Sequence, residues 1–125
     1  YNCDAQRIPL DTASFDVVYS STVFGPIVDD DKAKAIASEM TRLAKPGGWI
    51  VVRDWTLSRP GDANFSGLSL ARFRRLWETS PDFAVPGALI PPIGRMLSAY
   101  ASWLYFPVQT LVPPLVGMKV YALRR

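Results

Sequence analysis

Two polar sites, each following an apolar run of this sequence, hold the residues best suited to do chemistry. The hydroxyls of residues 20–22 come directly after the run Phe15–Tyr19, and the carboxylate of Asp54 follows a second run at 49–52. Apolar runs of this length predict strands of a parallel sheet that is covered on both faces. Open α/β sheets bind ligands at the carboxyl ends of such strands. Asp54 and the hydroxyls are therefore expected to line one ligand-binding edge, where a carboxylate can accept a proton.

The segment between the two runs predicts the helix that joins them. Carboxylates at 29–31 suit its first turn, since they can cap free N–H groups and complement the helix dipole. Apolar residues then recur on one helical face, at Ala33, Ile36, Ala37, Met40, Leu43 and Ala44. Lys45 is expected to end the helix, and Pro46-Gly47-Gly48 to reverse the chain through positive φ. A strand–helix–strand unit of this kind implies a parallel sheet in an α/β protein.

Three segments, taken in their order and spacing, carry a family resemblance. They are Asp4-Ala5-Gln6-Arg7-Ile8-Pro9-Leu10, Ser14-Phe15-Asp16-Val17-Val18 and Glu39-Met40-x-Arg42-Leu43-x-Lys45-Pro46-Gly47-Gly48. Together they resemble the second half of the class I S-adenosylmethionine-dependent methyltransferases, in particular the small-molecule "type 11" group, over about residues 1–57. The resemblance implies a Rossmann-like α/β fold. It also implies one partial domain over residues 1–125, with a cofactor side at 1–57 and a substrate side at 58–125.

The resemblance assigns S-adenosyl-L-methionine as the cofactor and gives roles to five residues. Asp4 would accept a hydrogen bond from the adenine amino group, and the backbone N–H of Ala5 would meet the adenine ring. Ser20, Ser21 and Thr22 would approach the methionine part of the cofactor. The alternatives are an ordinary turn residue at Asp4 and an ordinary turn or cap at the three hydroxyls.

The sequence departs from the family pattern in one respect. It contains neither the family's glycine-rich turn nor the acidic residue that holds the ribose. The paired glycines at 47–48 follow a helix and precede a strand, which is the wrong order for a nucleotide-binding loop. The chain is therefore expected to be a truncated methyltransferase fold that lacks the first strands and is inactive alone, with a strand remnant at Tyr1–Cys3. The rival hypotheses are a non-catalytic methyltransferase-like binding module and, with less support, half of a nucleotide-binding dehydrogenase.

The amino-acid composition excludes several kinds of catalytic and binding site. The chain has one cysteine, Cys3, and no histidine. An intrachain disulfide, a zinc cluster and a Ser-His or Cys-His pair are thereby excluded, and no metal site is expected. A single cysteine fits a reducing, cytoplasmic setting. Nucleic acid is not an expected partner, because the basic residues are few and form no known motif.

The second half of the chain predicts several further elements. They are a loop at 56–67, a helix from Ser69 to Thr79, a strand at 83–90, a helix at 93–106 that Pro107 stops, and a terminal strand at 116–123. Arg72, Arg74 and Arg75 of the first helix are expected to form its solvated face. Binding of an anionic substrate is the alternative role for them.

The segment Met96–Met118 carries no charge over 23 residues, which is numerically long enough to span a bilayer of ~30 Å hydrocarbon. Its prolines, Gln109 and hydroxyls favour instead a buried or substrate-lid helix, with interfacial membrane contact as the alternative. The run at 89–107 is similar to bacterial methyltransferases that accompany surface-polysaccharide or lipid modification enzymes. That resemblance implies a lipid-linked or glycan-linked acceptor. The interfacial alternative implies a location peripheral to the membrane.

These observations favour methyl transfer from S-adenosylmethionine to a small-molecule or lipid- or glycan-linked acceptor, at oxygen. The sulfonium is already a good leaving group, so the protein must mainly align donor and acceptor in a dry pocket. A hydroxyl acceptor benefits from a base, and Asp54 is the candidate catalytic residue. A strand-end cap or a partner of Arg53 is the alternative role of Asp54.

Overall fold

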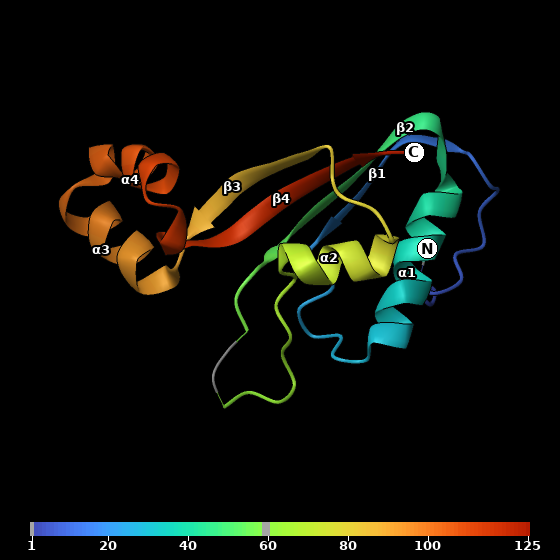
Figure 1. The fold of residues 1–125 in the computed structure, drawn as a ribbon, viewed down its shortest axis with the longest axis horizontal. Helices are drawn as coiled ribbons and strands as arrows, with labels where there is room; N and C mark the ends of the chain where they lie inside the picture. The colour runs from blue at the N-terminus through green and yellow to red at the C-terminus, as the bar shows by residue number, and fades with distance from the viewer. Residues whose placement is uncertain (1, 59–60) are drawn as a thin grey trace.

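The computed structural model describes residues 2–58 and 61–125. Its elements are β1 (Phe15–Ser21), α1 (Asp30–Leu43), β2 (Ala44–Trp55), α2 (Leu70–Trp77), β3 (Phe83–Leu89), α3 (Pro91–Tyr100), η1 (Ser102–Leu104), α4 (Tyr105–Leu111), η2 (Pro113–Leu115) and β4 (Val116–Arg124). The sheet has the order β1-β2-β4-β3, in which β1 runs parallel to β2 and β4 is antiparallel to both of its neighbours. The predicted α/β unit with a parallel strand pair is confirmed (Figure 1).

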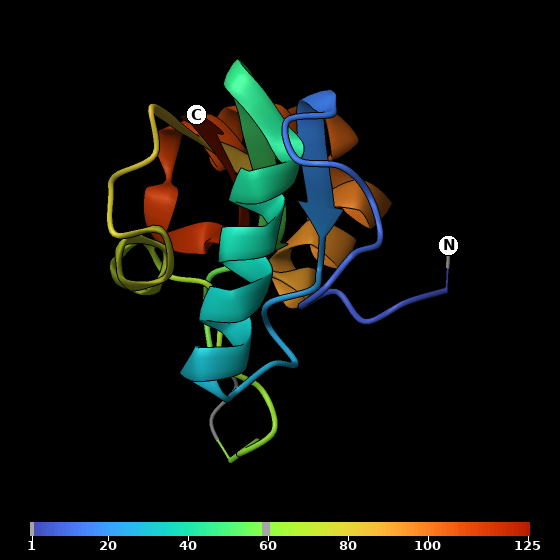
Figure 2. The same cartoon turned by 90° about the vertical axis from the view of Figure 1, so that its right-hand side faces the viewer.

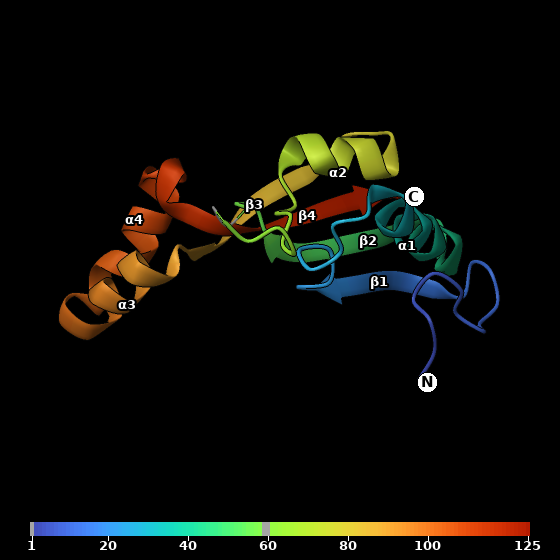
Figure 3. The same cartoon turned by 90° about the horizontal axis from the view of Figure 1, so that it is seen from below.

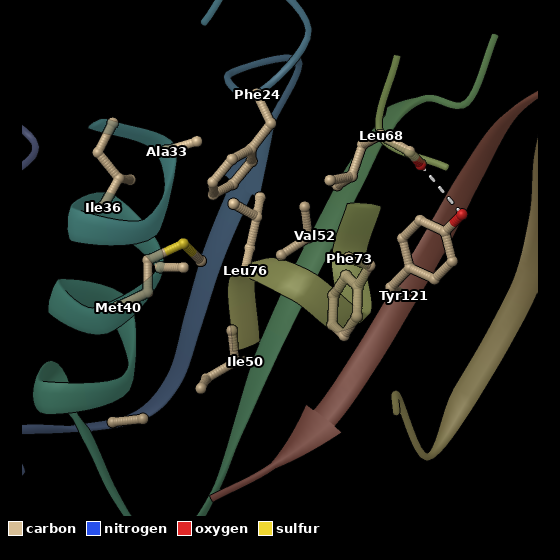
Figure 4. Packing of buried hydrophobic residues seen from close by; sticks show 12 residues of the cluster. Phe24, Ala33, Ile36, Met40, Ile50, Val52, Leu68, Phe73, Leu76 and Tyr121 are labelled. Carbon is tan, nitrogen blue, oxygen red and sulfur yellow. Dashed lines mark hydrogen bonds between the residues drawn. The ribbon is translucent and has the colours of Figure 1, made fainter. Parts of the chain in front are cut away.

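The core lies between one face of the sheet and the two helices α1 and α2, which cover the same side (Figure 3). Residues from both helices and from β2 and β4 meet there, with Phe73 and Tyr121 among the largest fully buried side chains (Figure 4). The Tyr121 hydroxyl donates a hydrogen bond of 3.1 Å to the Leu68 carbonyl, so its one polar group is paired. This single core holds the sheet and both helices together.

The opposite face of the sheet is bare in the described part of the chain. Alternation along β1 turns Val18 toward the core and Val17 and Tyr19 away from it, and the latter two are 54% and 58% exposed. Phe83 and Val85 of β3 are likewise exposed. The prediction that the strands are covered on both faces is therefore wrong for β1, because this structure supplies helices to one face only.

Helix α1 begins as the sequence predicts. Asp29 is its N-cap and accepts hydrogen bonds from the backbone N–H groups of Asp31 and Lys32 at 3.0 and 3.3 Å. The helix ends at Leu43, two residues before the predicted Lys45, and β2 begins directly after it. Near its C-terminal end, Glu39 accepts hydrogen bonds from Arg42 and from the Ile8 backbone, and these bonds lower the pKa of Glu39 to about 2.

The Pro-Gly-Gly segment forms an irregularity inside β2. Phe15 pairs with Ala44 and Val17 with Trp49, so the residues between bulge out of the ladder. Gly47 has the predicted positive φ, at 78°, whereas Gly48 is required for a different reason. A Cβ on Gly48 would lie 2.9 Å from two backbone oxygens, those of Asp16 and Lys45.

Several predicted boundaries change in the second half. The predicted helix at 93–106 is instead α3, η1 and α4, and Pro107 lies in the first turn of α4 rather than ending a helix. The predictions for α2, β3 and β4 are confirmed to within two residues. Residues 59–60 of the predicted loop and Tyr1 of the predicted strand remnant lie outside the described residues. Residues 2 and 3 form no strand, so that part of the prediction is wrong.

The α3–α4 unit projects beyond the carboxyl ends of β1 and β2 (Figure 1). In Figure 2, α1 lies in front and the α3–α4 unit lies behind, so this unit is separate from the helices that cover the sheet. The sequence predicts a buried or substrate-lid helix, and the burial is not found: no residue of α3 is buried, and Tyr100, Trp103 and Phe106 are largely exposed. Within the described chain, none of the helices has the length and apolar character needed to cross a membrane.

Candidate functional site

The hydroxyl residues 20–22 lie at the carboxyl end of β1, as predicted, but in three different environments. Ser20 pairs with Val52 in the sheet, and its Oγ is buried without a hydrogen-bond partner among the described residues. Ser21 Oγ lies 3.5 Å from the Arg53 guanidinium. Thr22 leaves the strand with a positive φ of 56°, and its N–H donates to the Arg53 carbonyl at 2.8 Å. An unpartnered buried hydroxyl fits a ligand group that hydrogen-bonds at this strand end.

Asp54 does not emerge at the sheet edge, so the prediction of its placement outside the core is wrong. The antiparallel pairing of Asp54 with Lys119 and of Trp55 with Met118 extends β2 beyond the predicted strand. Asp54 is 0% exposed, and its two carboxylate oxygens accept hydrogen bonds of 2.8 Å from the backbone N–H groups of Phe24 and Trp55. The alternative of a strand-end cap therefore describes its contacts, and its catalytic role stays a prediction.

The protonation of Asp54 is governed by its burial. Loss of solvent raises the pKa of its carboxyl above the ordinary value. Backbone hydrogen bonds from Phe24, Trp55 and Gly25, together with the charge of Arg72, act in the opposite direction. The Asp54 carboxyl group thus has a raised pKa, and both of its oxygens already accept hydrogen bonds from backbone N–H groups.

Asp4 and Ala5 are not brought next to residues 20–22. Asp4 is exposed, and its carboxylate accepts hydrogen bonds from the backbone N–H of Gln6 at 2.9 Å and from the Gln6 side chain. Ala5 packs against the core cluster. In Figures 1 and 3 the amino-terminal segment lies toward the amino end of β1, and the hydroxyls lie at its carboxyl end. The adenine-binding roles of Asp4 and Ala5 stay predictions, and the turn geometry matches the alternative for Asp4.

Two adjoining cavities lie where β2 ends and α3 begins. Trp55 and Pro91 line both of them, and their volumes are about 560 and 200 Å³. The larger also contacts Arg95, Ser98 and Tyr105, and the smaller contacts Leu57, Ser58, Phe65, Ile90 and Gly117. Among the described residues that line them, most are apolar, Arg95 is the one cation and none is a carboxylate. Sequence reasoning missed these residues, although the position of Trp55 directly after Asp54 could have pointed to the site.

The prediction that Arg72 lies on the solvated face of its helix is wrong. It is 2% exposed rather than solvated, whereas Arg74 and Arg75 are exposed as predicted. The Arg72 guanidinium donates to the Asp30 carboxylate at 2.9 Å and to the carbonyl of Phe24 at 3.0 Å. Helical periodicity cannot find this role, because the partners of Arg72 are remote in the sequence.

Within residues 2–58 and 61–125, no cluster of three or more His, Cys, Asp or Glu side chains is placed to hold a metal ion.

Comparisons with known proteins agree with the fold and with the first half of the sequence. Residues 1–52 match the family model described as "Methyltransferase domain". A S-adenosylmethionine-dependent methyltransferase from Methanosarcina mazei superposes with a TM-score of 0.62 at 11% identity, over 97% of this chain and 64% of that chain. A possible histamine N-methyltransferase from Thermotoga maritima gives 0.59 at 16% identity, over 96% and 60%. No curated protein matches the sequence.

A third similar structure is geranyl diphosphate C-methyltransferase from Streptomyces coelicolor, in complex with Mg²⁺, geranyl diphosphate and S-adenosyl-L-homocysteine. Its TM-score is 0.58 at 16% identity, over 98% of this chain and 52% of that chain. The chain therefore has the Rossmann-like α/β fold of S-adenosylmethionine-dependent methyltransferases, and it spans about half to two thirds of these proteins. Its first 52 residues carry the signature of a class I, type 11-like methyltransferase domain, which confirms the resemblance. S-adenosyl-L-methionine is the expected cofactor.

Proposed function

We propose that this chain forms one part of a S-adenosylmethionine-dependent methyltransferase that methylates oxygen in a small-molecule or lipid- or glycan-linked acceptor. The main support for the proposal is the arrangement of residues at the carboxyl ends of β1 and β2. Ser20, with its unpartnered Oγ, lies at the carboxyl end of β1, and the mainly apolar cavities begin at Trp55 at the end of the neighbouring β2. Cofactor and acceptor would thus meet at one edge of a methyltransferase sheet, where open α/β sheets bind ligands.

The cavities support an oxygen acceptor. The hydroxyls of Ser58, Ser98 and Tyr105 line them and can hydrogen-bond an alcohol or phenol. An amine that is protonated at neutral pH would meet Arg95, and none of the described lining residues is a carboxylate that could pair with it. The apolar lining residues, such as Leu89, would contact the apolar part of an alcohol or phenol acceptor.

The bare face of the sheet supports the view that this chain supplies only part of the catalytic domain. Exposed apolar residues of β1 and β3 form that face, including Val17, Tyr19 and Val85. All-parallel sheets are covered on both faces, and β1 and β2 form a parallel pair. We propose that a further layer, which also provides the glycine-rich turn, covers this face in the active enzyme. The alternative function, a non-catalytic binding module, would need no such turn.

Binding of S-adenosyl-L-homocysteine tests the proposal. The complete gene product is expected to bind it with micromolar affinity in calorimetric titration, and the 125 residues alone to bind weakly or not at all, because they supply one side of the site. Ser20→Ala should weaken binding by about two- to twelve-fold, the value of one hydrogen bond. Ser38→Ala, on the exposed side of α1, is the matched control and should change nothing.

Two results would contradict this. If the complete product does not bind the ligand, the binding-module alternative replaces the enzyme. If the 125 residues alone bind at micromolar concentration, the proposal that another layer completes the site is wrong.

We also propose that α3 and α4 contact a membrane surface, at its cytoplasmic side, where a lipid-linked acceptor would be available. Tyr100, Trp103, Phe106 and Leu111 are 75–88% exposed. Aromatic side chains of this kind favour the membrane–water interface. Arg95 is the one charged residue between positions 83 and 118, so little charge opposes partition into lipid.

Co-sedimentation with phospholipid vesicles checks the membrane contact. The protein is expected to bind, and joint replacement Trp103→Ser and Phe106→Ser should weaken binding at least about tenfold, since two large apolar side chains no longer enter the lipid. Val28→Ser removes an exposed apolar residue on another loop and serves as control. Equal binding by all three proteins, or no binding by any, would rule out this surface.

A further inference from the structure

Two buried side chains of opposite charge bind the same backbone segment after β1. The Asp54 carboxylate accepts the N–H of Phe24 at 2.8 Å, and Arg72 Nη1 donates to the carbonyl of Phe24 at 3.0 Å. Both side chains are almost fully buried, at 0% and 2% exposure. The two polar groups of one loop residue are thus held by two charges that come from β2 and α2.

Arg72 also donates hydrogen bonds to three other residues. Its Nη2 donates to the carbonyl of Ile27, its Nη1 to the carbonyl of Ser66 at 2.5 Å, and its Nε to Asp30 at the start of α1. A planar guanidinium with five donors suits such multiple binding, which a lysine cannot reproduce. The side chain therefore joins the loop at 22–29, the segment before α2 and the first turn of α1.

The two segments that Arg72 joins also contact each other and reach the smaller cavity. The N–H of Ser66 donates to the carbonyl of Gly25 at 2.8 Å. A Cβ on Gly25 would lie 2.5 Å from the Phe65 ring, so Phe65 packs directly on the loop backbone. Phe65 in turn lines the cavity together with Trp55. The position of that wall thus depends on the backbone that Asp54 and Arg72 hold.

We infer that Asp54 and Arg72 are positioning residues that clamp Phe24–Ile27 against Phe65–Ser66 and so shape the acceptor cavity. The clamp itself depends only on the described contacts. Its consequence for methyl transfer rests on the proposed function. In this arrangement Asp54 acts through the loop and not by taking a proton from the acceptor.

The chemistry of the clamp predicts which substitutions weaken it. Asp54→Asn keeps the shape of the side chain but replaces one acceptor oxygen by an NH₂ donor, which then faces a backbone N–H of Phe24 or Trp55. Arg72→Lys keeps the charge but cannot reach the carbonyls of Phe24, Ile27 and Ser66 together. Arg75→Lys is the matched control, because Arg75 binds Asp30 at 3.2 Å from an exposed position on the same helix.

Amide hydrogen exchange on the complete gene product tests the clamp directly. In Arg72→Lys and Asp54→Asn, the amides of Phe24, Ile27 and Ser66 are expected to exchange at least about tenfold faster, the effect of one lost hydrogen bond to a charged group. The β2 core amides should keep their protection, and Arg75→Lys should resemble the wild type throughout. Unchanged exchange at the three loop amides, or an equal acceleration of loop and core amides, would overturn the clamp.

Should Asp54→Asn fail to fold, Arg72→Lys and Gly25→Ala keep the test decisive. Gly25→Ala leaves both charged residues in place and forces the Phe65 ring to move away from the loop. It should speed exchange at Ser66 while leaving the amide of Phe24 protected by Asp54. Loss of protection at Phe24 in this variant as well would show that the loop is not held by Asp54.

Steady-state kinetics then separates positioning from proton transfer, once the complete protein shows methyltransferase activity. If the clamp is right, Asp54→Asn and Arg72→Lys both raise the acceptor KM, and the pH profile of kcat keeps its shape. A fall in kcat of about 10²–10⁴-fold confined to Asp54→Asn, with loss of one limb of the pH profile, would instead identify Asp54 as a general base and overturn the proposal. Because exchange is measured without substrate, failure of the enzyme proposal leaves the clamp test intact.

Discussion

Replacing Phe73 by alanine is expected to lower the free energy of unfolding by about 3–5 kcal/mol. Phe73 is fully buried on the sheet side of α2. Its ring stacks on Trp77 at 4.4 Å between centroids and lies 4.9 Å from the ring of Tyr121. The substitution removes the apolar side chain and also two aromatic contacts, and α1, α2 and the sheet cannot collapse into the cavity without losing other contacts.

Urea unfolding, followed by circular dichroism, measures this loss. Phe73→Leu is the matched variant, because it keeps most of the apolar volume and loses chiefly the ring contacts, so it should cost about half as much or less. Phe106→Ala removes the same side chain from an exposed position on α4 and should cost little. A loss below about 1 kcal/mol for Phe73→Ala would mean that α2 is not held against the sheet as the structure shows.

Gly67→Ala is expected to have the second largest effect, a loss of about 1–3 kcal/mol or more. A Cβ at this position would lie 2.6 Å from the carbonyl carbon of Leu57 and 2.7 Å from the carbonyl group of Thr56. These are backbone atoms, so no side chain can turn aside to relieve the clash. The next residue, Leu68, donates its N–H to the Trp55 carbonyl at 2.7 Å, which holds the two segments together.

Gly94→Ala provides the matched control for the backbone clash. A Cβ there would meet its nearest atom, in the Tyr105 ring, at 3.5 Å, an ordinary contact. Gly94 lies inside α3, where alanine is favoured over glycine by up to about 1 kcal/mol. Thermal unfolding should therefore show a lower midpoint for Gly67→Ala and an equal or higher midpoint for Gly94→Ala. A neutral Gly67→Ala variant would contradict the close approach of residues 56, 57 and 67.

The local sequence determined the strand–helix–strand unit of β1, α1 and β2. The carboxylate of Asp29 caps α1 because an N-cap needs only a short-range acceptor, and the apolar stripe that follows faces the core. The two apolar runs became β1 and β2, and the hydroxyls of residues 20–22 stand at the strand end where the sequence places them. These features depend on residues at most a few positions apart, so the sequence alone predicts them.

The family signature was also contained in the sequence. It rests on the order and spacing of short segments, and residues 1–52 match the methyltransferase model without any structural information.

The environment of Asp54 was decided by the tertiary structure. Its burial depends on pairing with Lys119 in β4, which is 65 residues later in the chain and prolongs β2 past the predicted end. Strand ends are set by partner strands as much as by local preference, and for that reason the sequence pattern stopped β2 too early. A predicted edge carboxylate thereby became a buried acceptor for the backbone of Phe24.

Arg72 and the α3–α4 unit show the same limit of sequence reasoning. Helical periodicity assigns an arginine to solvent, yet Arg72 is buried because the carbonyls of Phe24 and Ile27, more than 40 residues away, converge with that of Ser66 on its donors. Conversely, the uncharged segment from Met96 suggested burial, but Tyr100, Trp103 and Phe106 stay exposed because the segment extends beyond the end of the sheet. The sequence determines which residues can be buried or bind one another, and only the converging chain segments decide which of them do.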